Sequence, residues 1–438
     1  MKLPIEFEER MSALLGADYP AFKSALTEGR ATKGLITGCK ASADVIESTL
    51  PVKRLPYGGY TFDFDSPGKH PLHHAGAFYV QDPSAIATGA AVEPRAGWRV
   101  LDTCASPGGK SISYGSRIGD TGLLVSNEIS PARAKVLASN IERMGLRNTI
   151  VTNLPTEALG GMYSAYFDLV IADVPCSGEG MFRKYPEALS GWNTGMVKKC
   201  AKLGEEILEN VCTCVRHGGY LLFSTCTFSP EEDEEQIERF LSRHPDFSLC
   251  ELPESLWAVT APGIGGIGRR FYPHISEGEG QYICLLKRAC EKDPSVTFNN
   301  TGRPPSREEL SVLSDFLREN THVDPADLAV YSCRDGLRAL STAHPVADKG
   351  VFAYGVNLGS VEKGVFRPHH QFFSAYGRQF KRIAELDEEK ARLYLTGNVV
   401  PFDIENGWCA LSYMGAHLGG GKATGGIIKN HYPKGLRN

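Results

Sequence analysis

The chain has 438 residues, of which 42% are hydrophobic and 22% charged, and its formal net charge at pH 7 is −4. This composition is that of an ordinary globular protein long enough for two or three domains. The negative net charge excludes a broadly basic nucleic-acid binder, so any basic surface must be local. The N-terminus lacks the features of a signal peptide, and no run of about 18 apolar residues predicts a membrane span.

Twelve cysteines are spread from Cys39 to Cys409, and no two of them form a Cys-x-x-Cys pair. This pattern supports neither a zinc site nor a disulfide framework, so a reducing, cytoplasmic compartment is the simpler inference. His70, His73 and His74 are clustered but carry no metal spacing on their own, and we expect no bound metal.

The N-terminal region, residues 1–75, is expected to be a helical cap followed by a small, mixed, turn-rich segment. Two apolar stripes run through residues 5–30: Phe7, Met11, Leu14 and Leu15 form the first, and Phe22 and Leu26 the second. Pro20 is expected to separate two helices there, since proline breaks a helix interior.

Strand and helix patterns alternate from Trp98 to Lys287. The expected strands are 98–103, 122–127, 149–153, 166–172, 219–225 and 280–287, and the expected helices are 108–118, 130–144, 195–216 and 230–243. Such alternation predicts an α/β fold with a mostly parallel, doubly wound sheet. For the last helix, Ser229 is the expected N-cap, with Pro230 at N1 and Glu232 completing a capping box.

A loop of small residues, Asp102-Thr-Cys104-Ala-Ser-Pro-Gly-Gly-Lys110, follows the first of these strands and opens a helix. Small residues let the backbone approach a ligand, and a helix N-terminus offers unpaired N–H groups. The spacing is neither that of a Walker loop nor that of the dinucleotide-binding glycine motif. Glu128 ends the second strand, where a carboxylate can accept both hydroxyls of a ribose. An ordinary surface glutamate is the alternative at that position.

Two cysteines stand at the carboxyl ends of predicted strands. Cys176 follows the strand that ends at Asp173, and Cys226 follows the strand 219–225. A single free cysteine is usually a packing residue. However, these two strands are neighbours in a sheet of this class, so both thiols and Asp173 should face one cleft. Packing alone does not explain two thiols and a carboxylate beside a ligand-binding glycine turn.

The loop from Asp102 to Lys110, Asp173-Val-Pro-Cys176-Ser-Gly and Ser224-Thr-Cys226-Thr together resemble the motifs of the Nop/Sun RNA (cytosine-5) methyltransferases. The tail Lys429-Asn-His-Tyr-Pro-Lys-Gly-Leu-Arg437 is similar to the RNA-binding end of bacterial 16S rRNA methyltransferases of the RsmF type. The resemblance implies a Rossmann-like class I methyltransferase domain at 76–290, dependent on S-adenosyl-L-methionine. It also implies a monomer whose partner is 16S rRNA or the small ribosomal subunit.

The resemblance further assigns the donor contacts. Glu128 is expected at the ribose, Asp173 beside the donor, and Asn153 at the adenine amino group, where the family has an aspartate. The expected contacts of the glycine turn are Cys104, Ala105, Ser106, Pro107, Gly108, Gly109 and Lys110.

By the same resemblance Cys226 is the nucleophile, Cys176 assists product release, and Lys110 orients Asp173 or the base. The chemistry explains these residue types independently. Carbon 5 of cytosine is a poor nucleophile, and attack of a thiolate at carbon 6 makes it enamine-like. Asp173 can steady the charge that shifts as the adduct forms, and the base must be splayed out of its helix to reach the site.

The segment 291–305 is polar and carries proline and glycine, which predicts a linker before a helix at 306–320. Residues 306–438 form the expected C-terminal α+β region, whose end the resemblance makes a PUA-like barrel. Two stretches, 363–383 and 422–438, are basic without any acidic residue. The basic residues of the first stretch alternate with the aromatic residues Phe366, Phe372, Phe373, Tyr376 and Phe380. We therefore expect phosphate contacts and base stacking there, and expect truncation at the linker to spare donor binding.

Three alternatives stay open on the sequence. The same chemistry on tRNA is compatible with the catalytic motifs, and only the C-terminal tail favours rRNA. A non-catalytic RNA-binding ribosome assembly factor would not need both Cys176 and Cys226. A DNA methyltransferase would use the cysteine of its Pro-Cys motif and leave Cys226 without a role.

Overall fold

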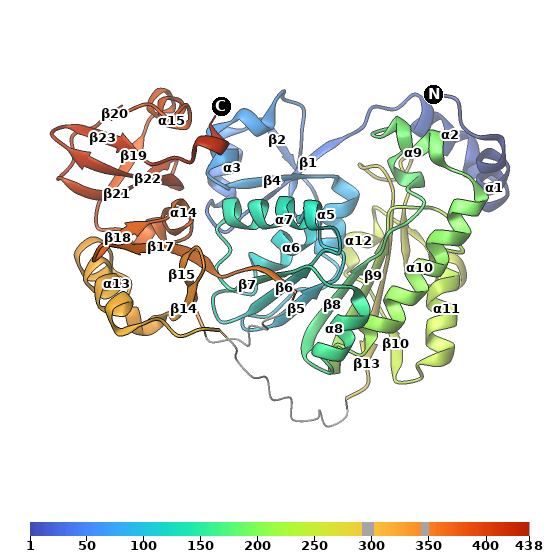
Figure 1. Ribbon diagram of the computed structural model, residues 1–438. Coiled ribbons are helices and arrows are strands. Elements are labelled where there is room, and N and C mark those ends of the chain that lie inside the picture. Colours follow the sequence, from blue (N-terminus) through green and yellow to red (C-terminus); the bar gives the residue numbers. More distant parts are fainter. Residues whose placement is uncertain (291–301, 343–349, 438) are drawn as a thin grey trace.

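A mixed, ten-stranded sheet is the centre of the protein in the computed structural model, which describes residues 1–290, 302–342 and 350–437 (Figure 1). The six strands expected from the alternation are β5 (Arg99–Asp102), β6 (Leu123–Asn127), β7 (Thr149–Thr152), β8 (Phe167–Asp173), β9 (Val215–Thr225) and β13 (Gln281–Arg288). Strands β5 to β9 are parallel, in the spatial order β7-β6-β5-β8-β9. The order in which successive strands are added to the sheet therefore reverses between β5 and β8. Ligands bind at such a switch point in sheets of this class. The predicted Rossmann-like fold is confirmed.

Helices cover both faces of this sheet, because alternate residues of each strand point to opposite sides. Val100 and Leu169 belong to one apolar cluster, whereas Leu101 and Val170 belong to the other. The helices of the first face are α5 (Pro83–Gly89), α6 (Gly109–Gly115) and α7 (Pro131–Met144), and those of the second are α8 (Thr156–Met162), α10 (Thr194–Cys212) and α11 (Glu234–Arg243). The sheet is thus a buried middle layer with only its ends accessible.

Helix α11 begins four residues later than the capping box predicts. Its N-cap is Asp233, without a side-chain bond, and residues 230–233 form turns. The hydroxyl of Ser229 donates instead to Glu179, and the carboxylate of Glu232 accepts from Ser177. Tertiary hydrogen bonds therefore take the groups that the local motif would have used.

Both edges of the large sheet carry strands that the alternation does not predict. At one edge lie the antiparallel strands β10 (Phe247–Cys250), β11 (Ala261–Pro262) and β12 (Arg269–Phe271). At the other edge β16 (Val351–Tyr354) pairs antiparallel with β7, so a strand from beyond the predicted linker completes the sheet. Truncation at the linker would remove this strand, so the structure leads us to expect an effect on donor binding, whereas the sequence predicts none. Most of the linker, residues 291–301, lies outside the described residues.

The N-terminal region packs beside the catalytic sheet. Helices α1 (Ile5–Leu15) and α2 (Tyr19–Thr27) match the two apolar stripes, although α1 ends at Gly16 rather than at Pro20. The turn-rich segment is a four-stranded antiparallel sheet with two short helices: β1 (Lys33–Thr37), α3 (Ala43–Thr49), β2 (Val52–Arg54), β3 (Tyr60–Phe62), α4 (Pro71–His74) and β4 (Phe78–Gln81). Phe7 and Phe22 pack against Phe228, two residues beyond Cys226. The helical cap thus supports the cysteine loop.

The C-terminal region contains two further sheets (Figure 1). The first follows α13 (Arg307–Asn320) and contains β14 (Ala329–Cys333), β15 (Gly336–Leu340), β17 (Val356–Glu362) and β18 (Val365–Pro368). After α14 (His370–Tyr376), the second contains β19 (Ile383–Leu386), β20 (Val400–Pro401), β21 (Gly407–Tyr413), β22 (Ala416–Thr424) and β23 (Ile427–Asn430), with α15 (Glu388–Leu395) at its side. In the described ranges, no helix is long and apolar enough to cross a bilayer.

The predicted stacking aromatics of this region lie in its core. Phe366, Phe372, Phe373, Tyr376 and Phe380 are all buried and form one cluster with α13. They are therefore unavailable to RNA bases, and the expectation of base stacking on them is wrong. The basic residues Arg367, Arg378 and Lys381 lie on the flanks of α14 and are exposed, whereas the rings between them are buried.

Candidate active site

The carboxyl ends of β5, β8 and β9 bring the predicted site residues together. In the parallel register Asp173 lies opposite Ser224, and Asp102 lies opposite Ile171. Cys176 and Cys226 follow on the loops that leave β8 and β9. The sequence-based prediction that both cysteines share one cleft with Asp173 agrees with this geometry.

The two thiols are in direct contact. The Sγ atoms of Cys176 and Cys226 lie 2.8 Å apart, and the backbone amide of Cys226 donates to Sγ of Cys176 at 3.2 Å. The hydrogen bond with Cys226 and burial together raise the pKa of Cys176 well above its ordinary value. Cys176 therefore keeps its proton at neutral pH and can supply it to the neighbouring sulfur.

Asp173 is held from both sides. Its Oδ2 forms an ion pair of 2.7 Å with Nζ of Lys110, and its Oδ1 accepts from Ser224 at 2.6 Å and from Gln281 at 3.4 Å. Burial alone would lower the pKa of Lys110, but the Asp173 carboxylate raises it above its ordinary value. The ammonium thus stays charged and fixes the carboxylate. Gln281 comes from the antiparallel strand β13, and no sequence motif indicates its role.

Two buried carboxylates tie the cysteine loops to each other. Glu232, beyond Cys226, accepts from the amide of Ser177 at 2.8 Å and from its hydroxyl at 2.5 Å. Glu179, beyond Cys176, accepts from the amide of Phe228 at 2.9 Å. Burial raises the pKa of Glu232 to about 7. The sequence analysis missed this pair, since Glu232 was interpreted as a local helix cap.

The glycine turn and Glu128 outline a second part of the site. Gly108 has φ +121° and needs glycine, whereas a Cβ on Gly109 would lie 2.7 Å from the movable end of the Gln81 side chain. The side chain of Glu128 is 3% exposed; its Oε1 accepts from the Ser130 amide at 2.9 Å. These contacts fix the carboxylate before any ligand arrives.

Asn153 and Asp102 complete this part. The amide nitrogen of Asn153 donates to the carbonyls of Glu128 and Ile129, at 2.6 and 2.9 Å, so its side-chain oxygen is the group that could accept a hydrogen bond from a ligand. Oδ1 of Asp102 is buried and has no hydrogen-bond partner within the described residues, and burial raises the pKa of this carboxyl to about 7. A helix N-terminus, a fixed carboxylate and an unpaired acceptor suit a zwitterionic nucleoside such as S-adenosylmethionine.

A basic surface remains on the C-terminal sheet after the aromatics are assigned to the core. Lys422 and Lys429 are exposed and lie opposite each other on β22 and β23. The ammonium of Lys422 lies 5.8 Å from the ring centre of the half-buried Trp408. Arg367 is also exposed. Burial lowers the pKa of the nearby His431, and the charges of Arg367 and Lys422 lower it further. We call Lys422, Lys429 and Arg367 the basic face.

Comparison with known families gives three matches along the chain. They are 16S rRNA methyltransferase RsmB/F over residues 90–287, the N-terminal domain of 16S rRNA methyltransferase RsmF over 3–83, and the methyltransferase RsmF PUA domain over 381–438. The last match identifies the five-stranded C-terminal sheet as a PUA domain.

Curated relatives and solved structures agree with these matches. Ribosomal RNA small subunit methyltransferase F of Vibrio vulnificus is 28% identical over 381 residues, covering 83% of this chain and 80% of that protein. The corresponding protein of Shewanella loihica is 28% identical over 385 residues, with 83% and 78% covered. A methyltransferase homolog protein from Pyrococcus horikoshii shares the fold, with TM-score 0.54, 24% identity and coverage of 65% and 94%. NSun6 from Pyrococcus horikoshii with SFG also shares it, with TM-score 0.58, 19% identity and coverage of 66% and 99%.

Proposed function

The chain belongs to the RsmB/F family of 16S rRNA methyltransferases, and from this premise we propose that it methylates carbon 5 of a cytidine through a covalent Cys226 adduct. It is an S-adenosylmethionine-dependent RNA methyltransferase of the small ribosomal subunit. The contact of the Cys176 and Cys226 sulfurs, 2.8 Å apart beside Asp173, is the observation that carries the proposal. An enzyme that methylates an exocyclic amino group would have no use for two such thiols.

The donor is bound by residues on the β5 and β6 side of the cleft. Glu128 accepts from the ribose hydroxyls, the oxygen of Asn153 accepts from the adenine amino group, and the Cys104–Lys110 turn surrounds the methionine part. When bound, S-adenosylmethionine supplies an electrophilic methyl group on a sulfonium. These assignments follow from the fixed Glu128 carboxylate and from the two glycines that keep the turn open.

Addition begins with the Cys226 thiolate, which bonds to carbon 6 of the cytosine and moves an electron pair to carbon 5. The Asp173 carboxylate, fixed by Lys110, accepts from the polar edge of the base and holds the ring in the cleft. Carbon 5 then bonds to the methyl group with that electron pair, while the methyl–sulfur bond of the donor breaks and its electrons stay on the sulfur as a neutral thioether. A thiolate is required because the thiol itself is a weak nucleophile.

Elimination regenerates both the aromatic base and Cys226. A proton leaves carbon 5 to solvent, its bonding pair forms the 5,6 double bond, and the carbon–sulfur bond breaks with its electrons on Cys226. The thiol of Cys176 is in contact with this sulfur and donates a proton to it as it departs. The raised pKa of Cys176 keeps that proton in place until the last step.

Substitution of each cysteine separates the two roles. We expect Cys226→Ala to form no adduct and to be inactive, because it lacks the attacking sulfur. Cys176→Ala should attack and methylate, then stall, so that labelled RNA remains attached to the protein through a denaturing gel. The double variant should leave the gel clear.

Two outcomes would contradict this assignment. An adduct that accumulates in Cys226→Ala would exchange the roles of the cysteines. Near-normal methyl transfer by both single variants, without adduct in either, would make them packing residues and would favour a non-catalytic RNA-binding protein.

We also propose a division of labour along the chain. Residues 76–290 carry the reaction, whereas residues 1–75 and 306–438 bind the RNA. The basic face supports this division, since its exposed lysines Lys422 and Lys429 lie side by side and are suited to phosphate contacts.

A further inference from the structure

A pocket of about 350 Å³ lies where the three regions of the chain meet. Cys39 and Lys40 line it from the N-terminal region, residues 115–124 and 145–149 from the catalytic sheet, and residues 374–379 with His417 from the C-terminal region. The catalytic segments precede or begin β6 and β7, at their amino ends. This pocket, which we call the junction pocket, therefore lies at the amino ends of the strands, whereas the cysteines and the proposed donor site lie at the carboxyl ends.

Two cations that line the junction pocket have no carboxylate partner among the described residues. Nζ of Lys40 is buried and donates to the Arg143 carbonyl at 2.9 Å and to the Ser374 hydroxyl at 2.5 Å. The Arg378 guanidinium donates to the Lys40 carbonyl at 2.7 Å. In the described part of the chain, no carboxylate forms an ion pair with either cation. By contrast, Arg147 on the same wall is paired with Asp120 at 2.7 Å.

Uncharged polar groups of the same wall also have unused hydrogen-bonding capacity. His417 is 5% exposed, and both of its ring nitrogens are buried without a partner within the described residues. The side-chain nitrogen of Asn148 and the hydroxyl of Ser116 are in the same condition. Buried polar groups in folded proteins are normally paired, so these groups around one cavity are available to a polar ligand.

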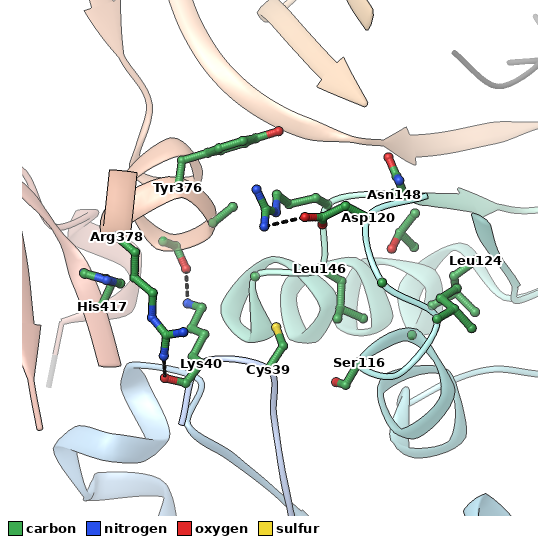
Figure 2. A pocket seen from close by; sticks show the side chains of 18 of the residues that line it. Cys39, Lys40, Ser116, Asp120, Leu124, Leu146, Asn148, Tyr376, Arg378 and His417 are labelled. Atoms are coloured by element: carbon green, nitrogen blue, oxygen red, sulfur yellow. Dashed lines mark hydrogen bonds and ion pairs between the residues drawn. The ribbon is translucent and has the colours of Figure 1, made fainter. Parts of the chain in front are cut away.

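The basic side chains and the leucines that line the pocket occupy different sides of it. Figure 2 shows Lys40, Arg378 and His417 together on one side and the aliphatic Leu124 and Leu146 on the other, with Cys39 between them. A charged head group thus has donors at one end, and an apolar body has a surface to pack on at the other. The volume lies near the lower bound of about 300 Å³ that is typical of small-molecule sites.

We propose that the junction pocket binds the phosphate group of a small anion, held by Lys40, Arg378 and His417. Phosphate accepts hydrogen bonds from both cations and from the imidazole N–H, and an ammonium and a guanidinium are the usual partners of phosphate. Burial of an ammonium without a counter-ion is unfavourable. Consistently, burial lowers the pKa of Lys40 to about 7, with a smaller contribution from Arg143 and Arg378. A bound anion would also hold the three regions together.

The first experiment compares Arg378→Gln with Arg318→Gln in the full-length protein. Arg318 is an exposed arginine of α13 that lies outside the pocket and serves as the matched control. By calorimetry at constant ionic strength, inorganic phosphate should bind wild type and Arg318→Gln equally and Arg378→Gln about tenfold more weakly, since one charge-assisted bond is lost. Phosphate should raise the melting temperature in the same order. Equal binding by all three proteins, or no binding by wild type, would overturn the proposal.

A second experiment tests Lys40 through its proton. Sulfate is the probe, because it carries no titrating proton near neutral pH. Since an anion raises the pKa of Lys40, wild type should take up protons on binding sulfate at pH 7.5, seen as a binding enthalpy that depends on the ionisation enthalpy of the buffer. Lys40→Met should show no buffer dependence. Sulfate binding without proton uptake by wild type would remove Lys40 from the site.

The source of the phosphate is decided by two further probes. If a free metabolite supplies it, adenosine monophosphate should compete with inorganic phosphate, and Arg378→Gln should bind rRNA as tightly as Arg318→Gln. If the RNA backbone supplies it, an rRNA fragment should compete and Arg378→Gln should bind that fragment more weakly. If neither adenosine monophosphate nor the rRNA fragment competed with inorganic phosphate, the assignment of a phosphate site would be wrong.

Discussion

Cys176 and Cys226 are identical side chains whose surroundings give them different tasks. Cys176 accepts the amide of Cys226 on its sulfur and keeps its proton, so it is suited to donate. Cys226 lies at the end of β9, next to Asp173 and Ser224, where a base can approach. At the scale of single residues, the roles we propose for them therefore rest on a few contacts shorter than 3.5 Å rather than on residue type.

Glu128 is the residue whose proposed role is tested without affecting the cysteines. Glu128→Gln keeps the shape and the bond to the Ser130 amide but removes the charge that accepts two hydroxyls. We expect donor affinity to fall by about 1–3 kcal/mol, measured by calorimetry with S-adenosylmethionine. Glu389→Gln, on the exposed side of α15, is the control. Unchanged affinity in Glu128→Gln would show that the ribose is bound elsewhere.

The start of α11 is the element whose tertiary contacts matter most for the site. Glu232 is withdrawn from the helix to hold the Cys176 loop, and Glu179 holds the Cys226 loop in return. The two loops therefore form one unit, and the distance between the sulfurs follows from this exchange of carboxylates. A helix that began at Pro230 would leave Ser177 without its acceptor.

Because the pKa of Glu232 is raised from 4.5 to about 7, the folded chain keeps a proton that the unfolded chain loses between these pH values. Its contribution to stability is complete below this window and is lost as the pH rises through it, by about 3 kcal/mol in total. Glu232→Gln should remove this part of the pH dependence in denaturant titrations, whereas Glu235→Gln, exposed on the same helix, should not. A parallel pH profile for wild type and Glu232→Gln would contradict the raised pKa.

The β22–β23 pair carries the second prediction at this scale. Lys422→Gln and Lys429→Gln should each weaken binding of an rRNA fragment and reduce the slope of log affinity against log salt by about one, because one phosphate contact is lost. Lys202→Gln, on the exposed face of α10, should change neither quantity. If all three variants keep the wild-type slope, the RNA does not contact the basic face.

The whole molecule is held together by segments that cross from one region into another. Strand β16 completes the catalytic sheet beside β7, and the carbonyl of Gly350 accepts from the amide of Asn153, a proposed donor contact. The helical cap packs on the loop after Cys226, and Lys40 bonds both to α7 and to α14. The backbone around Asn153 therefore depends on residues from beyond the linker.

A chain ending at residue 290 tests this dependence. Without β16, the edge of β7 loses its antiparallel partner and Asn153 loses an acceptor for its amide. We expect the shortened chain to melt at a lower temperature and to bind S-adenosylmethionine more weakly than the full chain, in addition to losing RNA affinity. Wild-type donor affinity and melting temperature in the shortened chain would show that the C-terminal region serves RNA binding alone.

The sequence by itself determined the parallel sheet and the position of both cysteines, because strand patterns and strand-end motifs are local. The resemblance to the family left open whether Lys110 contacts Asp173 or the base, and the structure has the contact with Asp173. Only the tertiary structure decided the pairing of β16 with β7, the burial of the C-terminal aromatics and the exchange of Glu232 and Glu179 between loops. Each of these depends on groups far apart in the chain that compete for one hydrogen bond or one apolar surface. The spacing of residues within a segment cannot indicate which distant group will make the contact.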